Sequence, residues 1–298
     1  MIVTSVVDVV TPISATCSGN ITADQGSIPT ERGVCWSTEQ TPDVTDNKTS
    51  GGTGVGEFSF LMTGLVPQTT YYARAYAVNK AGTSYGDEIP FTTPEDHTGE
   101  TGTVSDIDGN VYHTIGIGSQ FWTRENLKTT QFNDGTPIPL VTDNSTWQFL
   151  VAPGYCWYNN DETANKEVYG ALYNWYVVVS SKLPPAGWHV STDAEWTILE
   201  TFLGGLTGAG GKLKETGTDH WMTPNTGATN ETGFTALPGG MRAKDGSYSA
   251  LGETGNFWTN TTASNQAAWY RALDYLGTGN TRGNNSVNWG LSVRLVMD

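Results

Sequence analysis

Tryptophan is very unevenly distributed along this chain of 298 residues. Of its 11 Trp residues, only Trp36 precedes residue 120. Because a Trp side chain fills a large part of a core, a segment almost without Trp and a segment rich in it are expected to build different cores. The chain is also long for one core, since domains of about 100–150 residues are the commonest. We therefore predict two domains of different character.

The composition predicts a folded protein with an acidic surface. Hydrophobic residues make up 37% and aromatic residues 11%, which excludes global disorder. The formal net charge of −15 and the pI near 4.5 argue against nucleic acid and anionic membranes as main partners, because both repel such a chain. No apolar run approaches the about 18 residues of a transmembrane helix. We expect a protein that does not span a membrane, and the oligomeric state is left open.

The first residues predict a strand. The stretch MIVTSVVDVVTP has no basic segment and carries Asp8 among its apolar residues, unlike a signal peptide. If the protein is exported, we expect its signal or anchor to lie outside this sequence. The 3 Cys residues form no C-x-x-C pair, so neither a disulfide scaffold nor a zinc site is predicted.

Turn-forming sequence interrupts residues 1–94 at intervals of about 8–12 residues, which predicts an all-β sandwich. The predicted strands are residues 3–9, 14–21, 31–38, 57–63, 69–79 and 89–93. The stretch GLVPQTTYYARAYAVNKAGTSYG resembles a fibronectin type III domain, a sandwich common in bacterial surface proteins. Cys17 and Cys35 are expected on neighbouring core strands, either as a disulfide or as two buried thiols. Residues 95–103 are polar, contain two Gly and have no apolar anchor, so we predict a linker there.

Two helices are predicted in the second domain, residues 104–298. Val168, Leu172, Trp175 and Val179 recur at helical spacing within VYGALYNWYVVVSS, which predicts an amphipathic helix. Thr192 with Glu195 forms a capping-box pattern that starts a second helix, and Gly204–Gly205 provides its end. Loops with short strands are expected after residue 205, and a final strand over residues 290–296.

The blocks DIDGNVYHTIGIGSQFWTRENL, GYCWYNND, GWHVSTDAEWTILETFLGG, NETGFTALPGGMR and GLSVRLV follow one another in this domain. Together they resemble the Fibrobacter succinogenes major paralogous domain, a family of secreted bacterial modules. The resemblance implies an α+β, C-type-lectin-like fold, related in outline to the formylglycine-generating enzymes, with a loop-rich ligand face. It also implies that a disulfide common in the family is lost, because Pro184 and Leu295 stand at its cysteine positions, and that Cys156 is an unpaired buried thiol.

We expect no enzymatic activity. An oxidase of the formylglycine-generating type needs reactive cysteines, and Cys156 is the single cysteine of this domain. Hydrolase and phosphate-loop motifs are missing from the sequence. Of the histidines, His97 falls in the predicted linker and His113 on a strand, while His189 is expected to be a hydrogen-bonding core residue and not a base.

Calcium is the one cofactor that the sequence leaves open. Hard oxygen ligands of the kind that Ca²⁺ prefers cluster in two predicted loops, which are equally read as solvated turns. The candidate ligands are Asn159, Asp161, Glu162, Asn230 and Glu231. The Glu-Pro-Asn signature of calcium-dependent sugar-binding lectins is absent, and the nearest run is Thr223-Pro224-Asn225.

The segment from Trp258 to Asn288 is the predicted ligand-binding region. Trp269, Arg271 and Leu273 alternate with Ala272 and Asp274, so a strand here places the two sets on opposite faces. We expect the first set to be buried, and the second to point outward with an Asn-rich loop over residues 280–288. Amides and aromatic rings equip adaptable recognition surfaces. The predicted ligand-binding residues are Trp258, Asn260, Tyr270, Ala272, Asp274, Leu276, Asn280, Arg282, Asn284, Asn285 and Asn288.

These patterns predict a secreted or surface-displayed binding or adhesion protein of a bacterium or phage, which recognises a glycan or a protein on a cell surface. The resemblance adds the hypothesis that a retroelement diversifies the C-terminal segment, since adenine-directed mutagenesis changes Asn codons. Two alternatives are an accessory or degenerate enzyme of surface glycan processing, and a structural surface protein without a specific ligand.

Overall fold

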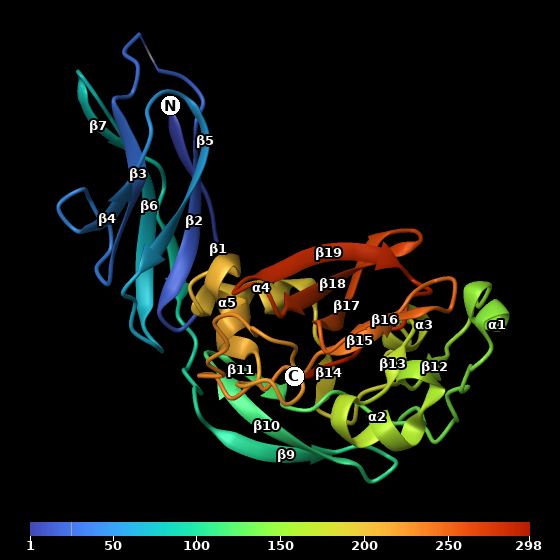
Figure 1. Ribbon diagram of the computed structural model, residues 1–298. Coiled ribbons are helices and arrows are strands. Elements are labelled where there is room, and N and C mark those ends of the chain that lie inside the picture. The colour runs from blue at the N-terminus through green and yellow to red at the C-terminus, as the bar shows by residue number, and fades with distance from the viewer. Residues whose placement is uncertain (25) are drawn as a thin grey trace. The chain divides into compact units, whose positions relative to one another are not determined.

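The computed structural model describes residues 1–24 and 26–298. The chain divides into two compact units, Met1–Asp96 and His97–Asp298, whose elements are labelled in Figure 1. Among the helices of the described residues, none is long and apolar enough to cross a membrane.

The first unit is a β-sandwich. One sheet has the order β1-β2-β5, with β1 at Ile2–Asp8, β2 at Ser14–Ile21 and β5 at Gly56–Thr63. The other has the order β4-β3-β6-β7, and β8 also pairs with β6. Its strands are β3 (Glu31–Ser37), β4 (Asn47–Ser50), β6 (Thr70–Asn79), β7 (Gly82–Tyr85) and β8 (Ile89–Thr92). All the predicted strands are present, and the structure adds the short strands β4 and β7.

Cys17 lies in the core between these sheets, whereas Cys35 lies on the other face of β3, beside the Pro42 carbonyl oxygen. Cys17 and Cys35 are buried free thiols, so of the two readings left open by the sequence the structure contains the thiols and not the disulfide. Burial raises the pKa of Cys17 to about 12 and that of Cys35 to about 11, because a thiolate is poorly solvated there. Neither thiol is suited to nucleophilic chemistry at neutral pH.

The predicted linker over residues 95–103 is wrong for most of its length. The second unit begins at His97, and its first strand, β9, spans Thr101–Ser105. The His97 carbonyl oxygen lies 2.0 Å from the position that a Cβ of Gly116 would occupy, so this approach requires glycine. The polar composition of these residues suggested a linker. An edge strand such as β9, whose side chains are mostly exposed, needs few apolar residues.

The second unit contains two five-stranded sheets. The first has the order β14-β20-β11-β10-β9, with β10 at Val111–Ile117, β11 at Gln120–Thr123, β14 at Trp188–Val190 and β20 at Leu295–Met297. The second has the order β16-β15-β17-β18-β19. Its strands are β15 (Gly239–Arg242), β16 (Tyr248–Leu251), β17 (Thr254–Ser264), β18 (Ala267–Asp274) and β19 (Asn280–Ser286). A short pair, β12 (Tyr155–Cys156) and β13 (Leu172–Tyr173), lies apart from both sheets.

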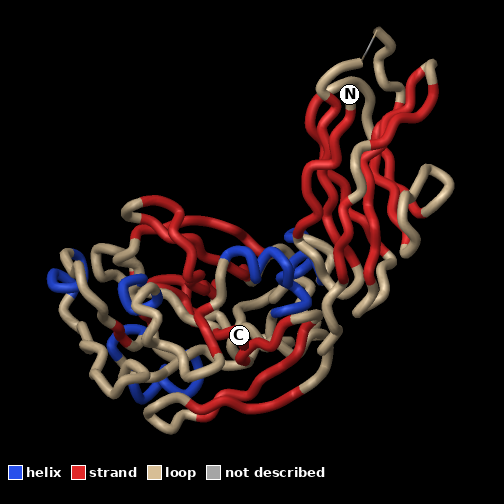
Figure 2. Tube along the Cα trace, turned by 180° about the vertical axis from the view of Figure 1, so that it is seen from behind, coloured by secondary structure: helices blue, strands red, loops and turns tan. Residues whose placement is uncertain are grey.

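Short helices and long loops make up the rest of this unit, as Figure 2 shows. The helices are α1 (Asn144–Gln148), η1 (Tyr158–Asn160), α2 (Glu162–Tyr169), α3 (Trp175–Val178), α4 (Asp193–Phe202) and α5 (Leu206–Leu213). The capping box of Thr192 and Glu195 that predicted α4 is present, and Gly204 and Gly205 end the helix with positive φ angles of 95° and 97°.

The helix predicted over residues 168–181 is wrong. Gly170, with φ 72°, ends α2, and Asn174 caps the separate helix α3 after the short strand β13. Of the four residues of the predicted stripe, Leu172 and Trp175 are buried in two different core clusters, whereas Val168 and Val179 are exposed. A period of 3.6 residues cannot distinguish one helix from this sequence of short elements.

The final strand is shorter than predicted and has no solvent-facing side. Regular pairing covers only Leu295–Met297, where β20 lies between β14 and β11. Ser292 and Arg294, which alternate with the apolar residues, are as completely buried as their apolar neighbours. The Arg294 guanidinium donates to the carbonyl oxygens of Thr123 (2.7 Å) and Phe234 (3.0 Å), which explains how a charged side chain is accommodated there.

Candidate ligand-binding face

Residues 280–286 form an edge strand, and not the loop that the sequence predicted. β19 pairs with β18 in antiparallel register from Leu273 opposite Asn280 to Ala267 opposite Ser286. Strand β18 therefore lies between β17 and β19, as Figure 1 shows. Asn and Gly are poor strand formers, but an edge strand takes its order from pairing with its neighbour, which is why the polar sequence concealed it.

The two faces of β18 differ as the period of two predicted. Arg271 and Leu273 are completely buried, whereas Ala272 is partly exposed and Asp274 is exposed. Residues directly opposite each other in an antiparallel pair share a face. Asn280 and Arg282 therefore lie with Leu273 and Arg271 on one side, which we name the covered face.

A chain of charged contacts joins the covered face to helix α4. Arg271 donates to Glu200 and to Asp193, with both distances 2.6 Å. Asn280 donates to the same Glu200 oxygen at 2.6 Å, and Arg282 donates to Asp193. Burial raises the pKa of Glu200, and the hydrogen bond from Arg271 opposes this only in part. At Asp193, burial acts in the same direction, but hydrogen bonds from Arg282 and Arg271 lower the pKa overall.

The other side of the β18–β19 pair is the open face, defined by Tyr270, Ala272, Asp274, Thr281, Gly283 and Asn285. Tyr270 stands opposite Gly283, and a Cβ there would lie 2.8 Å from the phenol ring, so the ring lies across the glycine. Thr281 stands opposite Ala272 and is exposed. This surface combines an aromatic ring, a hydroxyl, an amide and a carboxylate. Thr281 was not among the predicted residues.

Three predicted ligand-binding residues are buried. Trp258 is 0% exposed and donates its indole N–H to the Tyr173 carbonyl at 2.9 Å. Asn280 belongs to the contacts with α4, and the Asn288 amide donates to the Leu150 carbonyl. Each of these side chains is polar or amphipathic. The sequence alone could not show that its N–H groups donate to partners inside the protein.

The remaining predicted residues lie at the margins of the sheet. Arg282 is half-exposed, but its guanidinium lies 3.5 Å from the centre of the Trp269 ring and pairs with Asp193. Asn284 is exposed and opposite Trp269, and Asn260 is half-buried on β17. Leu276, 59% exposed, lies in the turn between β18 and β19.

Lys214 holds in place the turn that carries Leu276. This buried ammonium donates to the carbonyl oxygens of Asp274 (2.9 Å), Gly277 (2.9 Å) and Thr226 (3.0 Å). Burial lowers its pKa, because the charged form is poorly solvated. The open face is therefore supported both at its turn and along its strands.

Four of the five calcium candidates have a partner within the protein. Asp161 caps α2 by accepting from the Ala164 amide at 3.0 Å, and Glu162 pairs with Lys166 at 2.9 Å. Asn159 is a turn residue with φ 52°. Asn230 accepts from the Thr235 amide at 2.9 Å, and Glu231 pairs with Lys212 at 3.1 Å. Within the described residues, His, Cys, Asp and Glu side chains form no group of three that could hold a metal ion.

The histidines and Cys156 are likewise engaged. His189 lies between two carboxylates, with Nε2 2.6 Å from Glu195 and Nδ1 2.6 Å from Asp298. His113 pairs with Glu125 at 2.8 Å, and His220 with Glu215 at 2.8 Å. Cys156 is buried, which raises its pKa. His189 therefore has both ring nitrogens beside carboxylates, His113 and His220 are each paired through Nδ1, and the buried Cys156 is not an accessible thiolate.

A hollow of about 300 Å³ lies at the far end of β19, beyond the open face. We name it the end hollow. Its lining comes from the loop after α1, from α3, from the β17–β18 turn and from the end of β19. The residues are Gln148, Phe149, Val151, Tyr176, Lys244, Gln266, Ser286, Val287 and Asn288. Only Asn288 had been predicted as a site residue. The apolar run FLV before Ala-Pro-Gly, outside any periodic element, was the available signal.

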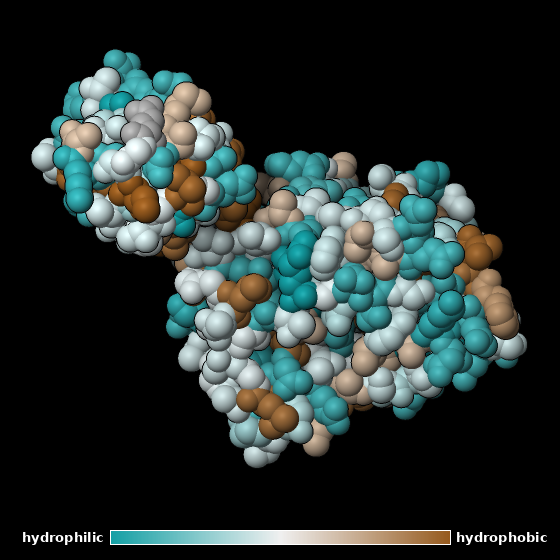
Figure 3. Space-filling model, turned by 90° about the horizontal axis from the view of Figure 1, so that it is seen from above, coloured by the Kyte–Doolittle hydropathy of each residue, from teal (hydrophilic) through white to brown (hydrophobic). Residues whose placement is uncertain are grey.

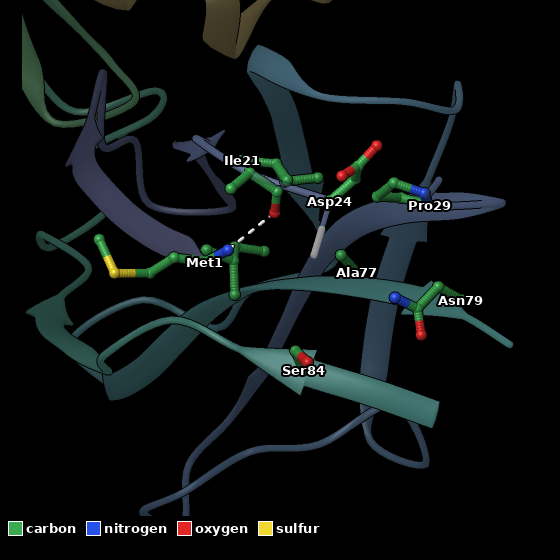
Figure 4. A pocket seen from close by; sticks show the side chains of 9 residues that line it. Met1, Ile21, Asp24, Pro29, Ala77, Asn79 and Ser84 are labelled. Atoms are coloured by element: carbon green, nitrogen blue, oxygen red, sulfur yellow. Dashed lines mark hydrogen bonds between the residues drawn. The ribbon is translucent and has the colours of Figure 1, made fainter. Parts of the chain in front are cut away.

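Further hollows have volumes of about 410, 510 and 430 Å³; the first two lie in the first unit and the third beside α4. Figure 3 shows that, seen from above, hydrophobic residues are confined to small separate areas among hydrophilic ones. A pocket in the first unit, drawn in Figure 4, is lined by residues such as Ile21, Pro29 and Ala77. Its volume is about 60 Å³, whereas ligand pockets usually measure about 300–1,000 Å³.

Comparison with known proteins places the second unit in a family. Among solved structures, the sixth fibronectin type III domain from human fibronectin type III domain containing protein 3 is 22% identical, with a TM-score of 0.26, over 34% of this chain and 89% of that one. The sensor domain of the anti-sigma factor RsgI4 in Pseudobacteroides cellulosolvens is 18% identical, with a TM-score of 0.24, over 32% of this chain and 74% of that one. No curated protein matches the sequence. Residues 115–297 match the family model of the Fibrobacter succinogenes major domain. The chain therefore belongs to the Fibrobacter succinogenes major domain family.

Proposed function

We propose that this protein is a non-enzymatic binding module, displayed outside the cell, whose second unit recognises a ligand on a cell surface through the open face. The observation that carries the proposal is the difference between the two faces of the β18–β19 pair. One face is fixed to α4 by buried charges, and the other presents the exposed Thr281 beside Tyr270 and Asn285, which are partly buried; the Tyr270 ring packs on the core against Trp258.

This arrangement has the physical properties of a recognition surface. Tyr270 offers a large contact area with few rotatable bonds, and Thr281 and Asn285 offer donors and acceptors that adapt to a partner. The contacts of Glu200 and Lys214 hold the backbone below them, so little conformational entropy is lost when a ligand binds.

The engagement of the histidines and of Cys156 supports a role without catalysis. His189 has both ring nitrogens beside carboxylates, and Cys156 is buried. A β-sandwich before the binding unit suits a spacer that holds the unit away from a surface. The proposal includes a C-type-lectin-like fold for the second unit. The last strand, β20, returns to pair with β11, an early strand of the unit, and this supports that part of the proposal.

Diversification of the C-terminal segment, if it occurs, has a structural constraint. Changes at Ala272, Thr281 or Asn284 alter the surface without disturbing the core. Changes at Asn280 would disturb its hydrogen bond to Glu200. A near-repeat of the coding DNA that differs at adenines, and that leaves codon 280 unchanged, would support diversification.

The test uses the full chain, labelled and applied to a glycan array and to whole bacterial and host cells. Thr281→Arg places a long cation on the open face, and Thr218→Arg makes the same change at another exposed threonine of the second unit. We expect binding that T281R abolishes and T218R retains. Equal binding by both variants would remove the open face from recognition, and hydrolysis of an arrayed glycan would contradict the non-enzymatic proposal.

A further inference from the structure

The end hollow holds two apolar side chains in contact with water. Phe149 is 76% exposed and Val151 is 80% exposed, the highest values among the large hydrophobic residues of the described chain. Leaving such side chains in water forgoes about 1.5–3 kcal/mol of burial free energy each. Exposed apolar groups beside a hollow commonly mark a ligand site.

The exposure of this pair is fixed by its neighbours. Between the two residues, Leu150 turns inward and packs against the cluster that contains Val141 and Trp147. The Asn288 amide donates to the Leu150 carbonyl and ties the loop to the end of β19. Phe149 and Val151 therefore point away from the core as long as Leu150 is seated in it.

The charge of the hollow is opposite to that of the protein. The chain carries 30 Asp and Glu and a net charge of −15, yet none of its acidic residues lines the hollow. Lys244 does line it. Among the residues described from His97 onward, every other Lys and Arg pairs with a carboxylate or a carbonyl, and Lys244 has no such partner. Its acidic neighbour, Asp245, accepts from the Ser247 amide (3.0 Å) and hydroxyl (2.6 Å) within its own turn.

We propose that the end hollow binds a sugar that bears a carboxylate, such as a uronic or sialic acid residue. The C–H face of the sugar ring would lie on Phe149 and Tyr176, its carboxylate would meet Lys244, and its hydroxyls would meet Gln148, Gln266 and Ser286. A volume of about 300 Å³ suits one or two sugar rings. An acidic peptide shares the charge but gains less from a ring face and several amides, so the observations favour the sugar.

This inference rests on the proposed binding function and adds the class of ligand. The probes are trigalacturonate and sialyllactose, each compared with an uncharged counterpart, the methyl ester and lactose respectively. The full chain is titrated by calorimetry at low and at high salt. Lys244→Gln is compared with Lys212→Gln, which removes a lysine that pairs with Glu231 instead.

We expect at least one charged probe to bind more tightly than its uncharged counterpart. K244Q should weaken that binding by roughly tenfold or more, as the loss of a charge-assisted hydrogen bond does, and K212Q should not. Phe149→Ala should weaken binding of charged and uncharged forms alike. Equal binding by K244Q and K212Q, or binding of hexaglutamate in place of both sugars, would overturn the assignment.

The outcome for the end hollow can be distinguished from the outcome for the open face. If cells bind and T281R abolishes the binding while neither charged sugar binds, the binding function stands and the end hollow assignment fails. If a charged sugar binds, K244Q loses it and T281R does not, the end hollow assignment stands and the open face fails.

Discussion

His189 is a single residue whose charge connects three segments of the second unit. Its nitrogens face Glu195, at the start of α4, and Asp298, beyond β20. The hydrogen bonds that His189 donates to Glu195 and to Asp298 raise its pKa from 6.5 to about 9, against the opposing effect of burial. The imidazolium is therefore a structural cation at neutral pH.

This pKa predicts a pH-dependent stability. Because the folded pKa is above the unfolded one, the stabilisation by His189 is fully present below pH 6.5 and is lost as the pH rises through about 9. Partial exposure limits it to about 1 kcal/mol. Urea unfolding at both ends of this range should show a smaller pH-dependent change for His189→Gln than for the wild type. An identical pH dependence would disprove the role of His189.

Arg271 is expected to matter far more than its neighbour Arg282, although both pair with Asp193. The Arg271 side chain is completely buried, and that of Arg282 is 39% exposed. Arg271→Met leaves the buried Glu200 without its cation and should lower the free energy of unfolding by about 3–5 kcal/mol. Arg282→Met should cost about 1 kcal/mol or less.

Adding Glu200→Gln to Arg271→Met tests the reason. If the uncompensated carboxylate causes the loss, the double variant should be more stable than R271M alone. Equal unfolding free energies for R271M and the double variant would instead assign the loss to packing.

At the scale of elements, prediction from sequence succeeded where local chemistry decides the structure. Helix α4 carries its own start and stop signals in Thr192, Glu195 and Gly204, and it was predicted correctly. Elements that depend on distant partners were not predicted correctly. β19 is a strand because it pairs with β18, and β9 is a strand because it pairs with β10. The outward face of β18 followed from its alternation. The end hollow could not be predicted from the sequence, because tertiary contacts bring its lining residues together from positions between 148 and 288.

Gly170 separates α2 from β13, and replacing it tests why the predicted long helix does not form. Its φ is 72°, and an added Cβ would lie 2.6 Å from the Leu127 carbonyl oxygen. Gly187 has a similar φ of 80° with no atom within 4 Å. Gly187→Ala should therefore show backbone strain alone, about 1 kcal/mol, and Gly170→Ala a clearly larger loss. Equal losses in chemical unfolding would show that the Leu127 contact relaxes without cost.

At the scale of the whole molecule, the second unit compensates for its lack of long helices with buried cations. Arg242 donates to the carbonyls of Val141 and Thr142, Arg294 to that of Thr123, and Lys214 to that of Asp274. Each cation donates to carbonyls that lie in loops or at the ends of strands, and a loop-rich unit must satisfy such carbonyls in its interior. This explains how short elements can support a stable surface.

The position of the boundary between the two units can be tested with fragments of the chain. A fragment that begins at residue 104 loses the first part of β9, the hydrogen bond from the His97 amide to the Gly118 carbonyl (2.8 Å) and the contact of the His97 ring with Phe121. A fragment that begins at His97 keeps them. One kcal/mol shifts the melting temperature of a domain of this size by about 2–4 °C, so we expect the shorter fragment to melt several degrees lower. A fragment from Pro94 should match the one from His97, because residues 94–96 belong to the first unit. Equal melting temperatures for the fragments from 97 and 104 would return residues 97–103 to the role of a linker.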